Sequence, residues 1–239
     1  MYKVKPRLFN GNSSLNEKLV AHWALDDEEN NQHYADSLGR IPGILVSPTH
    51  ETEVIAVSGL HGNATSLDGV DYIKIPSLLD ILEMDYNKLI SNFFVIKRGS
   101  VLGSHYCISS SRSSGSTKGI LLSISTTGTF AVEIIDGSGN YVKSETTTVI
   151  NTGSYDMCGY TWDGTNLKTY INGSEDTNNT SSGVLVSFAN TEFHIGHDPS
   201  TPGTYLELDA ILQQYSIWQK DLILPEAAAL YDGGVVLPC

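Results

Sequence analysis

The sequence contains few cysteines, and their number is odd. Only three occur in 239 residues, so at least one has no partner within the chain. Cys158 lies inside a predicted strand and is expected to be a small buried apolar residue, whereas Cys107 and the last residue, Cys239, carry no such indication. The count excludes a fold that depends on a framework of disulfide bonds.

Basic residues and long apolar runs are also scarce. Fourteen Lys and Arg oppose 27 Asp and Glu, which gives a net charge of −13 and argues against nucleic acid or an anionic membrane as a partner. This balance fits a soluble surface and leaves room for cation sites. No window holds the roughly 18 consecutive apolar residues of a membrane span, and the N-terminal residues lack the apolar core of a signal peptide.

The composition favours one domain rich in turns. With 40% hydrophobic and 9% aromatic residues, the chain can bury one sizeable core, and 22 glycines favour turns over long helices. Residues 1–18 are polar and irregular, so we expect an N-terminal arm outside the core, followed by a single domain at residues 19–239. The arm is either a disordered leader or a segment that docks onto a neighbouring subunit.

Strand patterns are clearest around residues 155–173. Residues 157–162 and 167–171 flank Asp163-Gly164-Thr165-Asn166, whose residue types favour a tight turn. The second run alternates between two faces, as a half-buried strand does. The pattern predicts further strands at residues 89–97, 120–125, 129–135 and 141–149, whereas residues 98–119 are rich in Ser and Gly and are expected to form a loop.

Several motifs resemble laminin G-like domains of the concanavalin A-like superfamily. They comprise the hairpin ending in Tyr-Ile-Asn-Gly at 170–173, the LVAHWALD run at 19–26, residues 61–76, the strand at 206–218, and a short helix at 221–234. The resemblance implies an all-β fold, a two-sheet antiparallel jelly-roll sandwich with a short C-terminal helix. It also places the first and last strands side by side, with Trp23 and Trp218 in the core.

The sequence argues against a catalytic centre of the kind found in glycoside hydrolases of this fold. Those enzymes carry three carboxylates along one strand, and here Glu207 and Asp209 are followed by apolar Ile211 and Leu212. No nucleophile elbow, metalloprotease histidine pair or Gly-rich phosphate loop is visible. We therefore predict no catalytic residue.

The resemblance implies a calcium site and a sugar site on loops. Asp26 and Asp209 match acidic positions of the family, and Asp71 is a further candidate ligand, with Asp36 and Asp68 as nearby alternatives. Asp36 and Asp68 are equally well suited to forming turns. Aromatic residues close to loop boundaries are candidates for stacking on sugars, and they are Tyr34, Tyr141, Trp162 and Tyr205.

The predicted function is that of a non-catalytic lectin-like or adhesive module that binds glycans or a protein surface. This domain type is usual outside cells, and the sequence shows no export signal, so we expect release by cell lysis or cleavage from a longer chain. The setting is then extracellular or on a virion surface, as in a phage capsid decoration or tail adhesin, with the arm contacting capsid or tail subunits. The alternatives are a structural cementing subunit and a glycoside hydrolase of the same fold.

Overall fold

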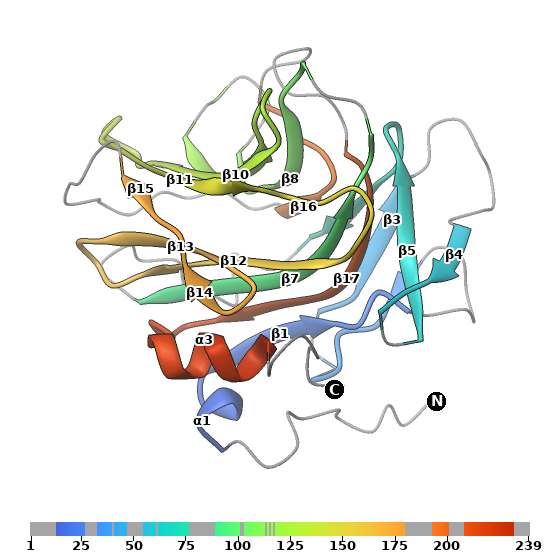
Figure 1. Cartoon of the computed structure of the whole chain (residues 1–239), viewed down its shortest axis with the longest axis horizontal. Helices are drawn as coiled ribbons and strands as arrows, with labels where there is room; N and C mark the ends of the chain where they lie inside the picture. The colour runs from blue at the N-terminus through green and yellow to red at the C-terminus, as the bar shows by residue number, and fades with distance from the viewer. Residues whose placement is uncertain are drawn as a thin grey trace.

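The chain folds into two antiparallel β-sheets that face each other as a sandwich (Figure 1). The computed structural model describes residues 13–26, 33–39, 41–46, 55–60, 62–76, 89–100, 103–112, 114, 116, 118–179, 193–200 and 208–231. Within these ranges, no helix has the length and apolar character needed to cross a membrane. The all-β jelly-roll prediction is confirmed.

One sheet has eight strands in the order β14-β13-β12-β7-β17-β5-β4, with β1 also paired to β17. Its strands are β1 (Leu19–Trp23), β4 (Ile55–Ser58), β5 (Asn63–Asp68), β7 (Ile90–Arg98), β12 (Asp156–Trp162), β13 (Leu167–Ile171), β14 (Ser174–Glu175) and β17 (Asp209–Trp218). Pairing of β1 with β17 confirms that the first and last predicted strands are neighbours.

The other sheet has nine strands in the order β15-β11-β10-β9-β8-β16-β6-β3-β2. Its strands are β2 (His33–Tyr34), β3 (Gly43–Val46), β6 (Tyr72–Ile75), β8 (Tyr106–Ser110), β9 (Gly119–Ile124), β10 (Thr129–Ile135), β11 (Tyr141–Val149), β15 (Asn178–Asn179) and β16 (Phe193–Ile195). Strands β10, β11 and β13 have the bounds that the alternation predicts.

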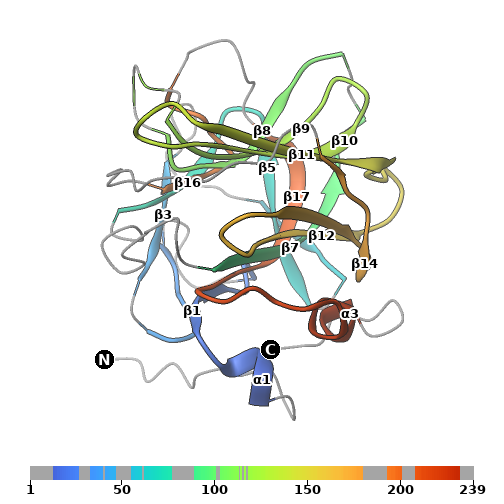
Figure 2. The ribbon, with the colours of Figure 1, turned by 90° about the vertical axis from the view of Figure 1, so that its left-hand side faces the viewer.

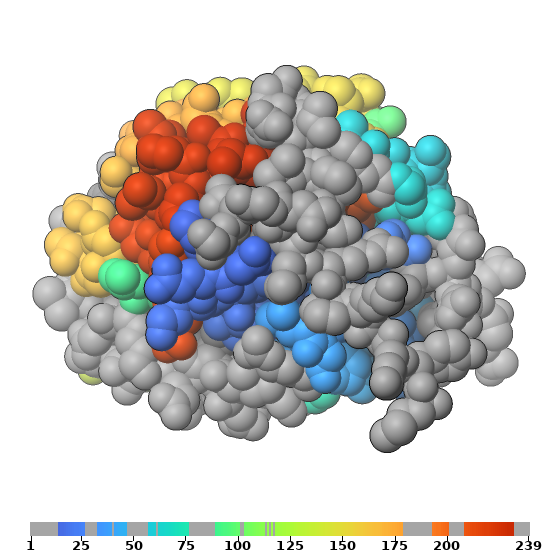
Figure 3. Space-filling model, turned by 90° about the horizontal axis from the view of Figure 1, so that it is seen from below, coloured from blue at the N-terminus to red at the C-terminus, as the bar shows by residue number. Residues whose placement is uncertain are grey.

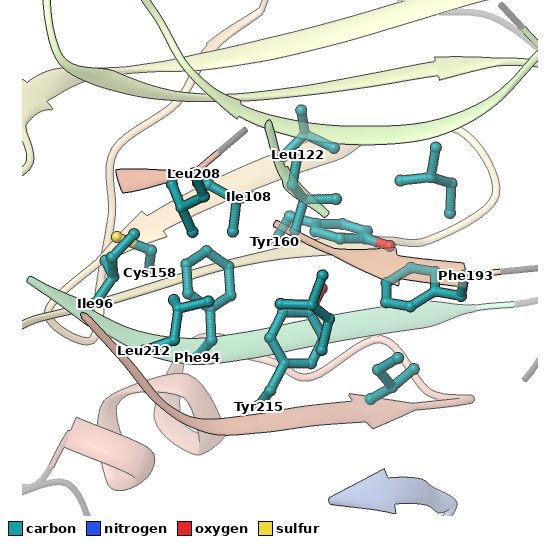
Figure 4. Close-up of a cluster of buried hydrophobic side chains, with 14 of the residues drawn as sticks. Phe94, Ile96, Ile108, Leu122, Cys158, Tyr160, Phe193, Leu208, Leu212 and Tyr215 are labelled. Carbon is teal, nitrogen blue, oxygen red and sulfur yellow. The ribbon is translucent and has the colours of Figure 1, made fainter. Parts of the chain in front are cut away.

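The main core fills the space between the sheets (Figure 4). Phe94 of β7 stacks on Tyr215 of β17 with ring centroids 5.5 Å apart, and it meets Phe130 of the opposite sheet edge-on at 5.6 Å. Trp23 lies in this core and is 0% exposed, as predicted, whereas Trp218 is also 0% exposed but lies on the outer face of the eight-stranded sheet. Burial of large aromatic rings from both sheets is a major source of stability in such a sandwich.

A second apolar cluster covers the outer face of the eight-stranded sheet. The helices α1 (Ser13–Asn16) and α3 (Leu224–Tyr231) both lie on that side of the sandwich (Figures 2 and 3). The cluster joins side chains of the helices to outward-facing side chains of the sheet, among them Leu15, Phe93, Val95, Met157, Tyr170, Trp218 and Leu230. The chain itself therefore covers this face.

This cluster corrects the predicted boundary of the N-terminal arm. Leu15 is 0% exposed, and its carbonyl oxygen accepts a hydrogen bond from Trp218 Nε1 at 2.7 Å. The packed domain thus begins before residue 19. Residues 1–12 lie outside the described residues, so the arm stays a prediction there.

The predicted loop at residues 98–119 is wrong in part, because it contains strand β8. Serines in this strand are buried with their hydroxyl groups paired. Ser109 Oγ lies 2.6 Å from Tyr215 OH, and Ser110 Oγ donates to Asp198 Oδ1 at 2.9 Å. A serine-rich run can belong to a strand when each hydroxyl group finds a partner.

The predicted starts of two elements near the C-terminus also differ from the structure. Helix α3 begins at Leu224 rather than at residue 221, and strand β17 is described from Asp209 onward.

Candidate functional site

A row of side chains crosses the outer face of the nine-stranded sheet. Residues that pair across neighbouring strands project to the same face. Their chain neighbours Ile73, Ile195, Leu122, Val132 and Val142 point into the core. The paired row, one residue from each of six adjacent strands, consists of Lys74, His194, Ser110, Leu121, Glu133 and Lys143.

Charged side chains at this face form a connected series that we call the charge chain. Arg112 Nη1 lies 3.8 Å from Asp198 Oδ2, and Arg112 Nη2 lies 3.1 Å from Glu133 Oε2. Lys143 Nζ lies 3.8 Å from Glu133 Oε1 and 3.4 Å from Glu145 Oε2. The charge chain therefore runs Asp198–Arg112–Glu133–Lys143–Glu145, with alternating sign.

Arg112 belongs to the buried end of the charge chain. It is 3% exposed, its backbone N–H donates to Ser110 Oγ at 3.0 Å, and its Nε has no hydrogen-bond partner among the described residues. The fully buried Leu121 lies between Ser110 and Glu133 in the row. A buried guanidinium requires paired carboxylates, so Arg112 fixes Glu133 and Asp198 relative to each other.

Glu145 ends the charge chain as an ionised carboxylate. Partial burial alone would raise its pKa, but a hydrogen bond from the Thr129 hydroxyl and the nearby Lys143 charge together lower it. The end of the charge chain on β11 is thus negative at neutral pH.

Three rings lie beside the charge chain: one on β6, one on β16 and one just after β16. Tyr72 and His197 are stacked with centroids 4.5 Å apart, and His194 lies 5.3 Å from Tyr72 and 5.5 Å from His197. Asp198 follows His197, and Ser200 Oγ donates to it at 2.8 Å. Residues 197–200 therefore lie against the outer face of the sheet, and Ser110 and Arg112 hold them there.

One of the predicted sugar-stacking residues belongs to this face. Tyr141 is 41% exposed and begins β11, where it pairs with Ile135. It shares a face with Lys143 and Glu145, because side chains alternate along a strand and Val142 points into the core. An exposed aromatic ring and the charge chain thus lie on one surface.

Two other predicted stacking residues are not at the surface. Trp162 is 0% exposed and Tyr34 is 6% exposed, both within the main core, and the Tyr34 hydroxyl accepts a hydrogen bond from Thr65 Oγ1 at 3.2 Å. Proximity to a loop in sequence does not determine which face of a strand a ring occupies. Tyr205 lies outside the described residues.

The predicted calcium ligands are not brought together. Asp71 is buried, and its Oδ1 has no hydrogen-bond partner among the described residues, whereas Asp209 is exposed and Asp26 is half-buried. In the part of the chain that the structure describes, no three His, Cys, Asp or Glu residues form a group that could hold a metal ion. Calcium therefore stays a prediction from the resemblance.

The two alternative aspartates hold turns. Asp36 Oδ1 accepts hydrogen bonds from the backbone N–H groups of His22 at 3.0 Å and Leu38 at 3.2 Å. Asp68 Oδ1 accepts one from the N–H of Val70 at 3.2 Å. Both carboxylates therefore have a local structural role.

Neither described cysteine is placed for nucleophilic chemistry. Cys107 and Cys158 are free thiols, and both are 0% exposed. Burial, with a further contribution from the charge of Asp156, raises the pKa of Cys158 well above its usual value and keeps it a neutral thiol. Cys239 and the predicted carboxylate Glu207 lie outside the described residues, and Leu212 is fully buried.

The sequence reasoning missed the charge chain. A signal existed in the strands at 129–135 and 141–149, where Glu133, Lys143 and Glu145 alternate with buried residues. No comparable signal marks Arg112 or Asp198, because their partners come from distant parts of the chain.

Comparison with solved structures identifies similar folds. The binding domain of paraclostridial mosquitocidal protein 1 matches with a TM-score of 0.69 and 17% identity over 91% of this chain and 52% of that domain. The botulinum neurotoxin serotype D binding domain matches with a TM-score of 0.66 and 17% identity over 91% and 51%. This chain thus spans about half the length of either toxin domain.

A third solved structure corresponds in size to the whole chain. Domain 4 of AbnA, a GH43 extracellular arabinanase from Geobacillus stearothermophilus, was solved in complex with arabinotriose. It matches with a TM-score of 0.61 and 20% identity over 90% of this chain and 98% of that domain. Identities this low show the fold alone.

Sequence comparison gives the family. No curated protein matches the sequence. A laminin G family model, described as the concanavalin A-like lectin/glucanases superfamily, matches residues 67–228, which is more than half of the chain. The protein therefore belongs to the concanavalin A-like lectin/glucanase superfamily.

Proposed function

We propose that the chain is a non-catalytic binding module that recognises glycans on the outer face of its nine-stranded sheet. The observation that carries this proposal is the exposed ring of Tyr141 on the same face as Glu133, Lys143 and Glu145. Sugar rings stack their apolar faces on aromatic side chains, while their hydroxyl groups bond to nearby polar groups. This face offers both kinds of contact.

The asymmetry of the sandwich favours this face over the opposite one. The outer face of the eight-stranded sheet is occupied by the cluster that includes Leu15, Trp218 and Leu230, with both described helices on that side. An apolar face covered by its own chain has little left to offer a ligand.

The comparisons support a binding role. The family description names lectins, the arabinanase domain was solved with arabinotriose, and the two toxin structures are binding domains. A protein surface is the other ligand class that these relatives suggest. The setting, extracellular or on a virion surface, and docking of the N-terminal arm onto capsid or tail subunits stay predictions from the sequence.

The test is binding of the purified chain to a glycan array, followed by affinity measurement on the best ligand. Tyr141→Ala is expected to weaken that affinity by about tenfold, because stacking is lost, whereas Tyr141→Phe should retain it. Ile223→Ala is the matched control, since Ile223 is 58% exposed beside α3 on the other side of the sandwich.

Two results would contradict the proposal. One is the absence of binding to any glycan together with tight binding to an assembled protein lattice, which would favour the cementing subunit. The other is release of reducing sugar from a polysaccharide, which would make the protein a hydrolase. Turnover that survives Glu207→Gln and Asp209→Asn would place its active site elsewhere.

A further inference from the structure

The charge chain contains two cations and three carboxylates. Arg112 lies between Asp198 and Glu133, and Lys143 lies between Glu133 and Glu145. Each of these cations therefore already faces two carboxylates, and a carboxylate stands at each end of the charge chain.

The charge chain has a buried half and an accessible half. The side chains of Arg112 and Asp198 are 3% and 1% exposed, whereas those of Glu133, Lys143 and Glu145 are 16%, 23% and 26% exposed. The accessible half lies on β10 and β11, and Tyr141 is the first residue of β11. A ligand stacked on Tyr141 would meet these three groups first.

Such an arrangement discriminates between ligand charges. An anionic group entering the site would have to draw Lys143 away from its two carboxylates, and it would meet a chain whose net charge is −13. A hydroxyl group can donate to a carboxylate and accept from the ammonium group at the same time, without breaking the ion pairs. Neutral polyols therefore match the site and acidic groups do not.

We infer that this module selects neutral glycans, which lack carboxylate, sulfate and phosphate groups. Glu133, Lys143 and Glu145 bond to the sugar hydroxyl groups, and Arg112 with Asp198 holds Glu133 in place. This inference rests on the proposed function and adds the charge class of the ligand.

The experiment compares matched pairs of oligosaccharides, such as galactose oligomers with galacturonic acid oligomers and dextran with dextran sulfate. The neutral member is expected to bind at least about tenfold more tightly. Its affinity should change less than about twofold between low and high salt, because a neutral ligand has no net charge whose attraction or repulsion by the protein salt could screen.

Substitution of the central carboxylate sharpens the test. Glu133→Gln leaves Arg112 and Lys143 with one carboxylate each, so binding of the acidic member should rise about tenfold relative to the neutral member. Glu145→Gln should produce a smaller shift in the same direction, and it provides a second reading if Glu133→Gln folds poorly. The matched control is Glu175→Gln, because Glu175 pairs with Lys168 on the opposite sheet.

The outcomes separate the two proposals. Binding of neither member of any pair would overturn the proposed glycan function and this inference with it. Tighter binding of the acidic member, or no change in charge preference in both Glu133→Gln and Glu145→Gln, would overturn the inference and leave the glycan function standing.

Discussion

Asp176 shows how a single residue can connect the two sheets. Its backbone N–H donates to Thr169 O in the eight-stranded sheet at 2.9 Å. Its side-chain oxygens accept hydrogen bonds from Thr147 N at 2.9 Å, Thr147 Oγ1 at 2.7 Å and Thr148 N at 2.8 Å in the nine-stranded sheet. Partial burial opposes ionisation, but these hydrogen bonds prevail and lower the pKa of Asp176 to about 2.

Asp176→Ala is expected to lower the free energy of unfolding by about 1–2 kcal/mol at pH 7, since charge-assisted hydrogen bonds are lost at a partly exposed site. The folded-state pKa lies below the ordinary value of 3.8, so the stabilisation is present above that value. The difference in the free energy of unfolding between wild type and variant should therefore decrease as the pH falls from 3.8 toward about 2. Urea denaturation across this range measures it.

The neighbouring variant Glu175→Ala serves as the control for Asp176. Glu175 forms an exposed ion pair with Lys168 at 3.1 Å, and its removal should change stability by less than about 0.5 kcal/mol. A difference in the free energy of unfolding between wild type and Asp176→Ala that stays constant over this pH range would contradict the prediction.

Residue environments were the hardest feature to predict from sequence. The strand motifs that resemble the family predict burial of Trp23 and Trp218, and both are buried, Trp23 between the sheets and Trp218 beneath the helices. Proximity to a loop predicts surface rings at Trp162 and Tyr34, but both rings lie in the main core. Tyr141 occupies a similar boundary, and it is exposed because its strand alternation turns it away from the core.

Helix α3 packs on the outer face of the eight-stranded sheet and buries apolar side chains there. Glu226 Oε2 accepts a hydrogen bond from Ile223 N at 3.1 Å, and its Oε1 lies 2.5 Å from Lys220 Nζ, so its first turn is capped. Ala227 and Leu230 then lie buried in the second cluster. An eight-residue helix is marginal alone, so its packing on the sheet stabilises it.

Leu230→Ala is expected to lower the free energy of unfolding by about 2–5 kcal/mol, because it removes buried side-chain volume between helix and sheet. Leu224→Ala is the control within the same helix, since Leu224 is 48% exposed and its loss should cost less than about 0.5 kcal/mol. Urea denaturation followed by tryptophan fluorescence measures both. Equal effects of the two substitutions would contradict this account of α3.

Elements with strict alternation were predictable, whereas elements built from small polar residues were not. Strands β10, β11 and β13 combine alternation with Gly- and Asn-containing turns. Strand β8 has serines where an apolar residue would mark a strand, and its pairing with β16 joins residues far apart in sequence. Only the assembled sheet shows that these serines have partners.

At the scale of the whole molecule, the jelly roll converts distant residues into one surface. The charge chain draws on β10, on β11, on Arg112 just after β8, and on Asp198 just after β16. Its geometry depends on the register of strands β8 to β11, which the sequence pattern does not specify. The fold could be predicted from motifs, but this surface could not.

The pairing of β1 with β17 has a mechanical consequence. Leu19 begins β1 and lies opposite Trp218, which ends β17. Force applied to the chain before Leu19 and after Trp218 would pull on the same end of this antiparallel pair. The strands would then separate from that end, one hydrogen bond after another, instead of shearing all of them at once. In optical tweezers we expect α3 and β1 to detach in a short first extension at low load, before the rest of the sandwich ruptures; a single abrupt event would contradict this behaviour.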